Sequence, residues 1–178
     1  MQLADDAAIL RVETVRARRA TAEDLARLYA LHSETFAAVA EKICGEAAPD
    51  AVQDAFVRAL TRVGTLRSNG ALAAWVWRIV MNEARRRAVT LAEERREQSV
   101  HEAPPNSDAD PRASQVRSIV SRLPMRQREV VFLRYFADLD EVSIAAILGI
   151  RRGTVAATLH QVHGRLRLEI ETGASPND

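Results

Sequence analysis

The sequence predicts an all-α protein in which two small helical modules are joined by a flexible linker and the second module is a helix-turn-helix. Apolar residues recur at the helical spacing of i, i+3, i+4 and i+7 in both halves of the chain, and no stretch alternates as a β-strand does. Between the halves, three prolines stand among Ser, Asn and Asp residues from Ala103 to Pro111, a composition that forms no packed element. The expected parts are a leader at 1–20, a helical domain at 21–97, the linker at 98–113, the helix-turn-helix domain at 114–170 and a tail at 171–178.

Composition limits the possible classes of protein. With 47% hydrophobic residues in 178, the chain has enough apolar material for helical cores. Its single cysteine, Cys44, excludes a disulfide framework and a multi-cysteine zinc site, and favours the reducing cytoplasm. No apolar run approaches the ~20 residues of a membrane span, so we expect no membrane insertion. The net charge of +1 argues against a non-specific polyelectrolyte binder, yet nine arginines against four acidic residues lie between Ser114 and Leu168.

The first domain is expected to start at a capped helix. The leader has no long apolar stripe, so it is expected to be frayed or weakly helical, or to be an extension from an upstream start codon. Thr21 and Asp24 form a capping box that opens a helix running to about Cys44, and Gly45 ends it. His32 lies in the apolar stripe of this helix and is interpreted as a packed histidine, as Cys44 is as a small buried residue.

A second helix begins near Pro49, which is tolerated in a first turn. This helix is expected to have an apolar buried stripe and a separate polar face. The stripe consists of Val52, Phe56, Leu60 and Val63, and the polar face of Asp50, Gln53 and Asp54. Carboxylates near a helix N-terminus favour the helix dipole, so this face by itself needs no function.

A loop from Gly64 to Gly70, which contains Ser68 and Asn69, leads into the third helix. The spacing of Leu72, Trp75, Val76, Ile79 and Val80 places Trp75 in the core. The last turns project Asn82, Arg85, Arg86 and Arg87, where cations suit the helix C-terminus and can also contact phosphate.

The second domain has four expected helices. Pro124 ends the first, whose stripe is Val116, Ile119, Val120 and Leu123. The next helix, Arg126 to Phe136, turns Val130, Val131, Leu133 and Phe136 inward and its arginines outward. Asp140 caps a short third helix, and Gly149 supplies the left-handed backbone of a tight turn. The fourth helix starts near Arg152 with Val155, Leu159, Val162 and Leu166 inside, which completes a helix-turn-helix pattern.

Five motifs, three in the second domain and two in the first, resemble those of one family. Leu123-Pro124-x-Arg126-Gln127-Arg128-Glu129-Val130-Val131, Ile144-Ala145-x-x-Leu148-Gly149-Ile150 and Gly153-Thr154-Val155 resemble the promoter-recognition domain of sigma-70-type factors, particularly the extracytoplasmic-function group, without a gap from about Val116 to Leu168. Asp50-x-Val52-Gln53-Asp54-x-Phe56 resembles the sigma-factor helix that docks on the clamp helices of RNA polymerase. Trp75-x-x-x-Ile79-x-x-Asn82-x-Ala84 resembles the part of the family that melts the minus-ten element and captures a flipped base in the preceding loop.

The resemblance implies three sets of site residues. Polymerase docking falls on Asp50, Gln53 and Asp54; minus-ten DNA on Leu66, Ser68, Asn69, Trp77, Asn82, Arg85 and Arg86; minus-thirty-five DNA on Arg151, Arg152, Thr154, Ala157, Thr158, His160, Gln161 and Arg165. The family often has Phe at the position of Leu66 and Asp at that of Arg86, so its base preference does not carry over. Trp77 is either a surface for stacking an unpaired base, worth ~1–3 kcal/mol, or a residue packed against the neighbouring helix.

The recognition helix departs furthest from the family pattern. Lys or Arg, Ser and Arg usually follow Gly-Thr-Val, whereas this sequence has Ala156, Ala157 and Thr158. His160 and Gln161 remain able to contact base edges, and arginines at both ends of the helix can contact phosphate. We therefore expect weak intrinsic affinity for DNA and a shallow salt dependence.

Two other classes of protein fit the sequence less well. An enzyme is disfavoured because no nucleophile and base pair, phosphate-binding glycine loop or metal-ligand cluster appears; His160 and His163 lack a third ligand. A response regulator would need an α/β receiver domain upstream, and no strand pattern is present. The resemblance implies a cytoplasmic extracytoplasmic-function-type sigma factor that needs no cofactor or metal and that binds core RNA polymerase, promoter DNA and an anti-sigma factor. The alternative is a degenerate relative that binds polymerase or an anti-sigma factor without directing promoters.

Overall fold

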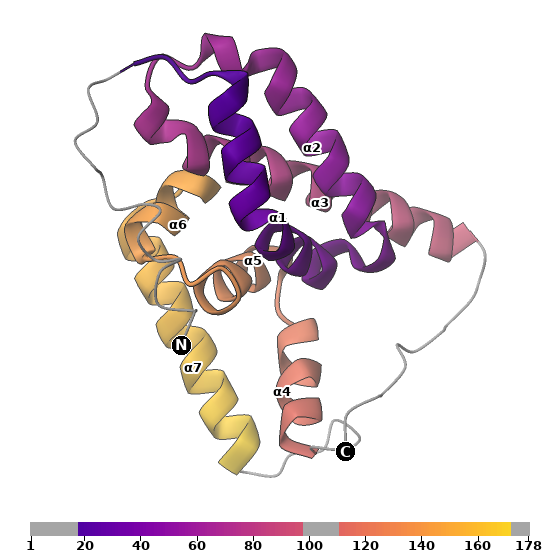
Figure 1. The fold of residues 1–178 in the computed structure, drawn as a ribbon. Helices are drawn as coiled ribbons and strands as arrows, with labels where there is room; N and C mark the ends of the chain where they lie inside the picture. Colours follow the sequence, from indigo (N-terminus) through magenta and orange to yellow (C-terminus); the bar gives the residue numbers. More distant parts are fainter. Residues whose placement is uncertain (1–17, 98–110, 172–178) are drawn as a thin grey trace.

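The computed structural model describes residues 18–97 and 111–171, which form helices connected by turns (Figure 1). No strand occurs in these two ranges, which confirms the all-α prediction. The front module contains α1 (Ala22–Cys44), α2 (Ala48–Arg62) and α3 (Leu72–Glu97), with 3-10 turns η2 (Gly45–Ala47), η3 (Val63–Thr65) and η4 (Asn69–Ala71). The back module contains α4 (Pro111–Ser121), α5 (Met125–Tyr135), α6 (Glu141–Leu148) and α7 (Arg152–Glu171).

The predicted helix caps are confirmed. The Asp24 amide donates to Thr21 Oγ1 at 3.3 Å, and the Thr21 amide donates to Asp24 Oδ2 at 2.9 Å, so α1 begins at a complete capping box. The Ser143 amide donates to Asp140 Oδ1 at 2.7 Å at the start of α6. Gly45 and Gly149 end α1 and α6 with φ of 59° and 66°, a backbone region that favours glycine.

The core of the front module forms where α1, α2 and α3 pack together. Phe36 is fully buried and its ring lies 4.4 Å from that of Trp77, between centroids. His32 is buried, as predicted. The Cys44 thiol is buried and donates to the Ala40 carbonyl, and burial raises its pKa, so it is a packing residue rather than a nucleophile.

Of the two tryptophans on α3, Trp77 takes the packed role that was one of its two alternatives, and Trp75 is less buried than its spacing predicts. Trp77 is only 5% exposed, whereas Trp75 is half-buried at the edge of the core. Because α3 packs on α1 and α2 and also against α6, its buried surface is wider than one apolar stripe. Packing, rather than base stacking, is therefore the role of Trp77 in this conformation.

Two other residues expected in the core are exposed. Leu60 on α2 is 56% exposed, and Phe136 is 47% exposed at the C-cap of α5. The Lys42 ammonium lies 5.4 Å from the centroid of the Phe136 ring, so this ring makes a cation–π contact with α1 instead of entering the core.

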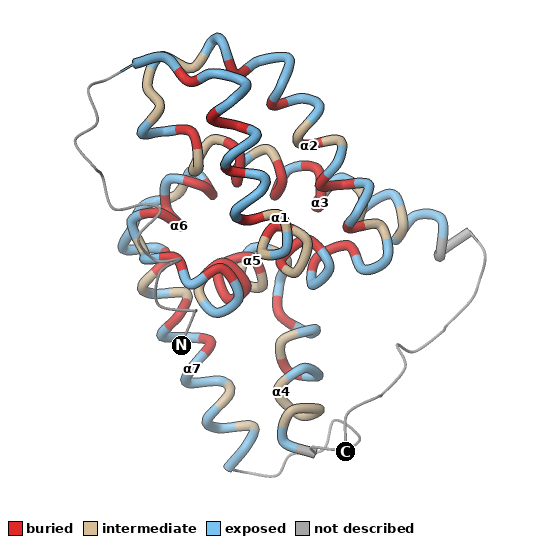
Figure 2. Tube along the Cα trace, in the orientation of Figure 1, coloured by how far each residue is buried: buried red, intermediate tan, exposed pale blue. Residues whose placement is uncertain are grey.

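The two modules pack against each other. Helix α5 contacts α1, and α6 contacts α3, so one cluster of buried residues runs through both modules (Figure 2). Helix α4 begins at Pro111, inside the range expected for the linker. The rest of the linker, most of the leader and the tail lie outside the described residues.

Candidate functional site

The predicted docking residues lie together on the exposed side of α2. The Asp50 side chain is 66% exposed and Gln53 is exposed, whereas Asp54 is 41% exposed and is paired with Arg87 from α3 at 2.7 Å, Nη2 to Oδ2. The hydrogen bond from Arg87 lowers the pKa of Asp54 and raises that of Arg87. Arg87 Nη1 also lies 3.7 Å from Asp50 Oδ2. Asp50 and Gln53 therefore remain open to a partner, while Asp54 also ties α2 to α3.

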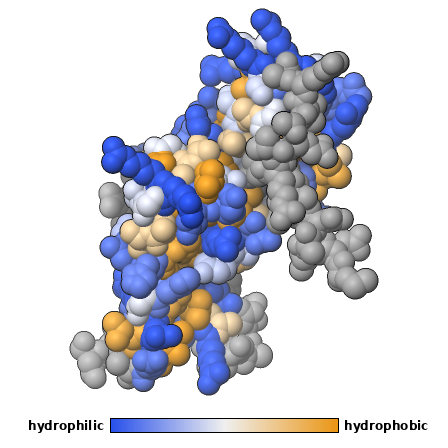
Figure 3. Space-filling view, turned by 90° about the vertical axis from the view of Figure 1, so that its left-hand side faces the viewer, coloured by the Kyte–Doolittle hydropathy of each residue, from blue (hydrophilic) through white to orange (hydrophobic). Residues whose placement is uncertain are grey.

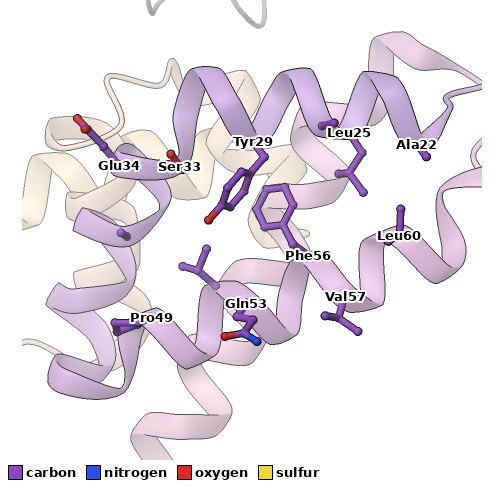
Figure 4. Close-up of a pocket in the computed structure, with 13 residues that line it drawn as sticks. Ala22, Leu25, Tyr29, Ser33, Glu34, Pro49, Gln53, Phe56, Val57 and Leu60 are labelled. Carbon is purple, nitrogen blue, oxygen red and sulfur yellow. The ribbon is translucent and has the colours of Figure 1, made fainter.

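An apolar groove between α1 and α2 adjoins this acidic face (Figure 4). The rings of Tyr29 and Phe56 meet edge to face at 4.7 Å in the groove, and Val57 and Leu60 line it with more than half of each side chain exposed. Gln53 belongs to both surfaces. Sequence reasoning missed the groove because it assigned Leu60 to the core, although the i, i+4 spacing of Phe56 and Leu60 was visible.

The predicted base-capturing loop is partly covered by the chain that precedes α1. Leu66, Ser68 and Asn69 are each half-buried. The Asn69 amide donates to the Arg18 carbonyl at 2.9 Å, and the Ala20 amide donates to the Leu66 carbonyl at 3.4 Å. The leader was expected to be frayed or weakly helical, yet its last residues are hydrogen-bonded to this loop.

Among the predicted minus-ten residues at the end of α3, Arg85 faces the back module. Its Nη1 donates to Asn82 Oδ1 at 3.0 Å, its Nε donates to Glu129 Oε1, and its Nη2 donates to Glu129 Oε2 at 3.2 Å. Arg86 pairs with Glu83 and lies 3.8 Å from Asp54 Oδ2. Glu129 is fully buried and also accepts from Arg126 Nη1 at 3.1 Å, so α3 and α5 share one buried carboxylate.

The predicted minus-thirty-five face lies on the outside of α7. Arg151, Arg152, Thr154, Ala157, His160, Gln161 and Arg165 are exposed, and Thr158 is half-buried. The Thr158 hydroxyl donates to the Thr154 carbonyl at 2.8 Å. Arg152 Nε contacts Glu141 Oε2 at 3.0 Å, and Arg165 Nε contacts Glu169 Oε1 at 2.6 Å. Many hydrophilic side chains project from the side on which α6 and α7 lie (Figure 3).

Within the described ranges, no group of three or more His, Cys, Asp or Glu side chains could hold a metal ion. No single described helix is long and apolar enough to cross a membrane; α6 and α7, which meet at a bend of 109°, pass that test of length and composition only as a pair.

Comparison with protein families matches both modules. Residues 28–93 match the model of sigma-70 region 2, and residues 113–164 match that of sigma-70 region 4. The first match covers most of α1 to α3, and the second covers most of α4, all of α5 and α6, and most of α7.

Similar proteins and structures carry related names. The chain is 30% identical over 135 residues to the RNA polymerase sigma-E factor of Streptomyces avermitilis, covering 70% of this chain and 72% of that protein. It is 30% identical over 130 residues to the extracytoplasmic-function sigma factor SigM of Mycobacterium tuberculosis, covering 68% of this chain and 63% of that protein. The fold resembles RpoE in complex with the anti-sigma factor NepR from Bartonella quintana (TM-score 0.65, 21% identity, 84% of this chain and 98% of that one). It also resembles CnrH in complex with the cytosolic domain of CnrY (TM-score 0.64, 22% identity, 84% of this chain and 89% of that one). The chain belongs to the sigma-70 family of RNA polymerase sigma factors, in its extracytoplasmic-function group.

Proposed function

We propose that this protein binds core RNA polymerase through the α1–α2 surface and directs promoter recognition and transcription initiation, with the front module at the minus-ten element and the back module at the minus-thirty-five element. The observation that carries the proposal is that one chain holds both sigma-70 regions, each with its predicted interface residues at an exposed or half-exposed surface, apart from Trp77. Catalysis belongs to the polymerase, so the protein itself is not an enzyme and acts in the cytoplasm, where the polymerase is. An anti-sigma factor is its proposed regulator, because the two similar structures named above are complexes and one of them is a complex with an anti-sigma factor.

The docking face can be tested with one charge reversal. Asp50→Arg removes an exposed acid whose contact with Arg87 is long, so the fold should persist while co-purification with core polymerase is lost. Glu41→Arg on α1 is the matched control, since Glu41 is equally an exposed acid but lies outside the predicted docking face. Polymerase binding that survives Asp50→Arg would remove the docking assignment. Asp54 is a poorer choice because its loss also breaks the contact with α3.

Promoter recognition is tested by transcription with core polymerase over a pooled genomic promoter library, followed by mapping of start sites. On the promoters found, Arg152→Ala should weaken DNA binding to a similar extent on all sequences. It should also make the dependence of the logarithm of the binding constant on the logarithm of the salt concentration less steep, by about the amount of one phosphate contact. Gln161→Ala should instead relax preference at one or two base pairs at a cost of ~1–3 kcal/mol. Equal losses on all sequences for both variants would contradict the assignment of Gln161 to base reading.

The second candidate is a degenerate sigma-like regulator. Ala156, Ala157 and Thr158 occupy recognition-helix positions that are usually polar or basic, which is the observation in its favour. A protein that co-purifies with core polymerase but initiates at no promoter in the library would support this candidate over the first.

A further inference from the structure

Three residues before α1, Arg18 to Ala20, form a short segment that we call the strap. The strap lies along the loop Leu66–Asn69 and is joined to it by two backbone hydrogen bonds, at 2.9 Å from the Asn69 amide to the Arg18 carbonyl and at 3.4 Å from the Ala20 amide to the Leu66 carbonyl. Ala20 is 2% exposed, so the end of the strap belongs to the core. Both ends of the loop are therefore fixed to the same short segment.

The strap itself is held by a buried acid. Arg18 donates to both oxygens of Asp24, from Nη1 to Oδ2 at 2.7 Å and from Nη2 to Oδ1 at 2.5 Å. Asp24 is 8% exposed and also accepts from the Thr21 amide and the Thr21 hydroxyl, both at 2.9 Å. A bidentate arginine–carboxylate pair fixes orientation as well as distance. The position of the Arg18 carbonyl, and with it the Asn69 amide, thus depends on Asp24.

The loop between these hydrogen bonds is also anchored from within the module. Leu66 packs against the core, and its amide donates to the Val63 carbonyl at 3.0 Å. The Ala71 amide donates to the Ser68 carbonyl at 3.2 Å, which fixes the C-terminal end of the loop where it joins η4. A loop held in one conformation before a ligand arrives loses less conformational entropy on binding.

We infer that Arg18 and Asp24 are positioning residues for the capture of an unstacked minus-ten base: the Asp24 carboxylate holds the strap through Arg18, and the strap holds the loop in its binding conformation. The inference rests on the proposed function, because that function makes Leu66, Ser68 and Asn69 a DNA-binding loop. It assigns a role in DNA opening to residues that lie before the part of the chain that matches sigma-70 region 2.

The test compares two arginines near the start of α1. Arg18→Ala frees the strap but leaves the contacts of the capping box, whereas Arg27→Ala removes an exposed pair with Glu23 that does not reach the loop. The probe is a promoter fragment from the transcription library with 2-aminopurine in the non-template minus-ten strand, bound by each holoenzyme. Base unstacking raises the fluorescence of the probe. We expect Arg18→Ala to reduce the equilibrium constant for unstacking about tenfold and Arg27→Ala to match the wild type, with unchanged affinity for core polymerase in both.

Two further measurements keep the outcomes separate. Arg18→Lys retains a cation beside Asp24, so it should restore part of the unstacking signal, a result that general misfolding would not give. Hydrogen exchange of the Asn69 amide should be faster in Arg18→Ala than in Arg27→Ala. This measurement is made on the free protein, so its result does not depend on the proposed function. Unstacking signals of equal size in the two alanine variants, or equal exchange at Asn69, would overturn the inference. A wild-type protein that starts no transcript would instead overturn the proposed function.

Discussion

Asp24 is the buried acid on which the first turn of α1 depends. The hydrogen bond from Arg18 and those from Thr21 stabilise its charged form and lower its pKa, against the opposing effect of burial. A carboxyl group with a lowered folded-state pKa contributes stability that is fully present above the unfolded value of ~4 and is lost as pH falls towards the folded value.

The pH dependence of unfolding should show this contribution. We predict that the free energy of unfolding falls below pH ~4 less steeply in Asp24→Asn than in the wild type, and that the two curves run parallel at higher pH. Urea titrations between acidic and neutral pH measure the difference. Asp54, Asp140 and Glu169 also have lowered pKa values, so only the difference between the two proteins reports on Asp24. Parallel curves over the whole range would contradict the assignment.

The residues predicted correctly from the sequence are those whose partners lie nearby in the chain. Thr21 with Asp24, and Asp140 with Ser143, are three residues apart, so local backbone geometry brings them together. The partner of Arg85 is Glu129, 44 residues away, and no local pattern selects it. Trp75 is less buried than its spacing predicts, and the sequence left both packing and base stacking open for Trp77, because a single apolar stripe does not describe a helix that packs against α1, α2 and α6.

At the scale of elements, the turn between α6 and α7 sets the direction of the recognition helix. Gly149 has φ of 66° and ψ of 37°, and the Ile150 amide donates to the Ala145 carbonyl at 3.1 Å. Arg126 of α5 donates to the Leu148 carbonyl at 2.8 Å, which satisfies one of the last acceptors of α6. The arginine of the Leu-Pro-x-Arg lead-in therefore supports the helix-turn-helix directly, a contact that the sequence motif did not reveal.

Replacing glycine by alanine at two positions tests whether backbone conformation, rather than lack of space, requires glycine in this turn. A Cβ added at Gly149 or at Gly164 meets no atom within 4 Å, so neither change causes a clash. Gly149→Ala forces alanine into the left-handed region and should destabilise the protein by ~1 kcal/mol. Gly164→Ala lies inside α7 and should stabilise it by ~0.5–1 kcal/mol.

Chemical denaturation of both variants checks the sign of each change. Stability changes of the same sign would mean that the left-handed turn is not what requires glycine at position 149.

At the scale of the whole molecule, the two modules are held together by buried and polar contacts that the sequence did not predict. Arg85 of α3 reaches the fully buried Glu129 of α5, and Arg78 of α3 donates to the Ala146 carbonyl of α6. The sequence predicted both modules because the helices of each have apolar residues at helical spacing. Their contact depends on side chains far apart in sequence, which periodicity does not encode.

This arrangement predicts that one arginine controls the compactness of the protein. Arg85→Ala leaves Glu129 with Arg126 alone and removes a contact between modules, so we expect a larger radius of gyration by small-angle X-ray scattering and faster hydrogen exchange in α5. Arg87→Ala is the matched control, because Arg87 also lies on α3 but pairs with Asp54 and Asp50 inside the front module. Glu129→Gln removes the charge with which Arg85 pairs but leaves Arg85 in place, so it separates the loss of this ion pair from the loss of any other contact of Arg85. The expected result is expansion in Glu129→Gln as well as in Arg85→Ala, with Arg87→Ala remaining compact. Equal dimensions in all three variants would show that the Arg85–Glu129 pair is not needed to hold the modules together.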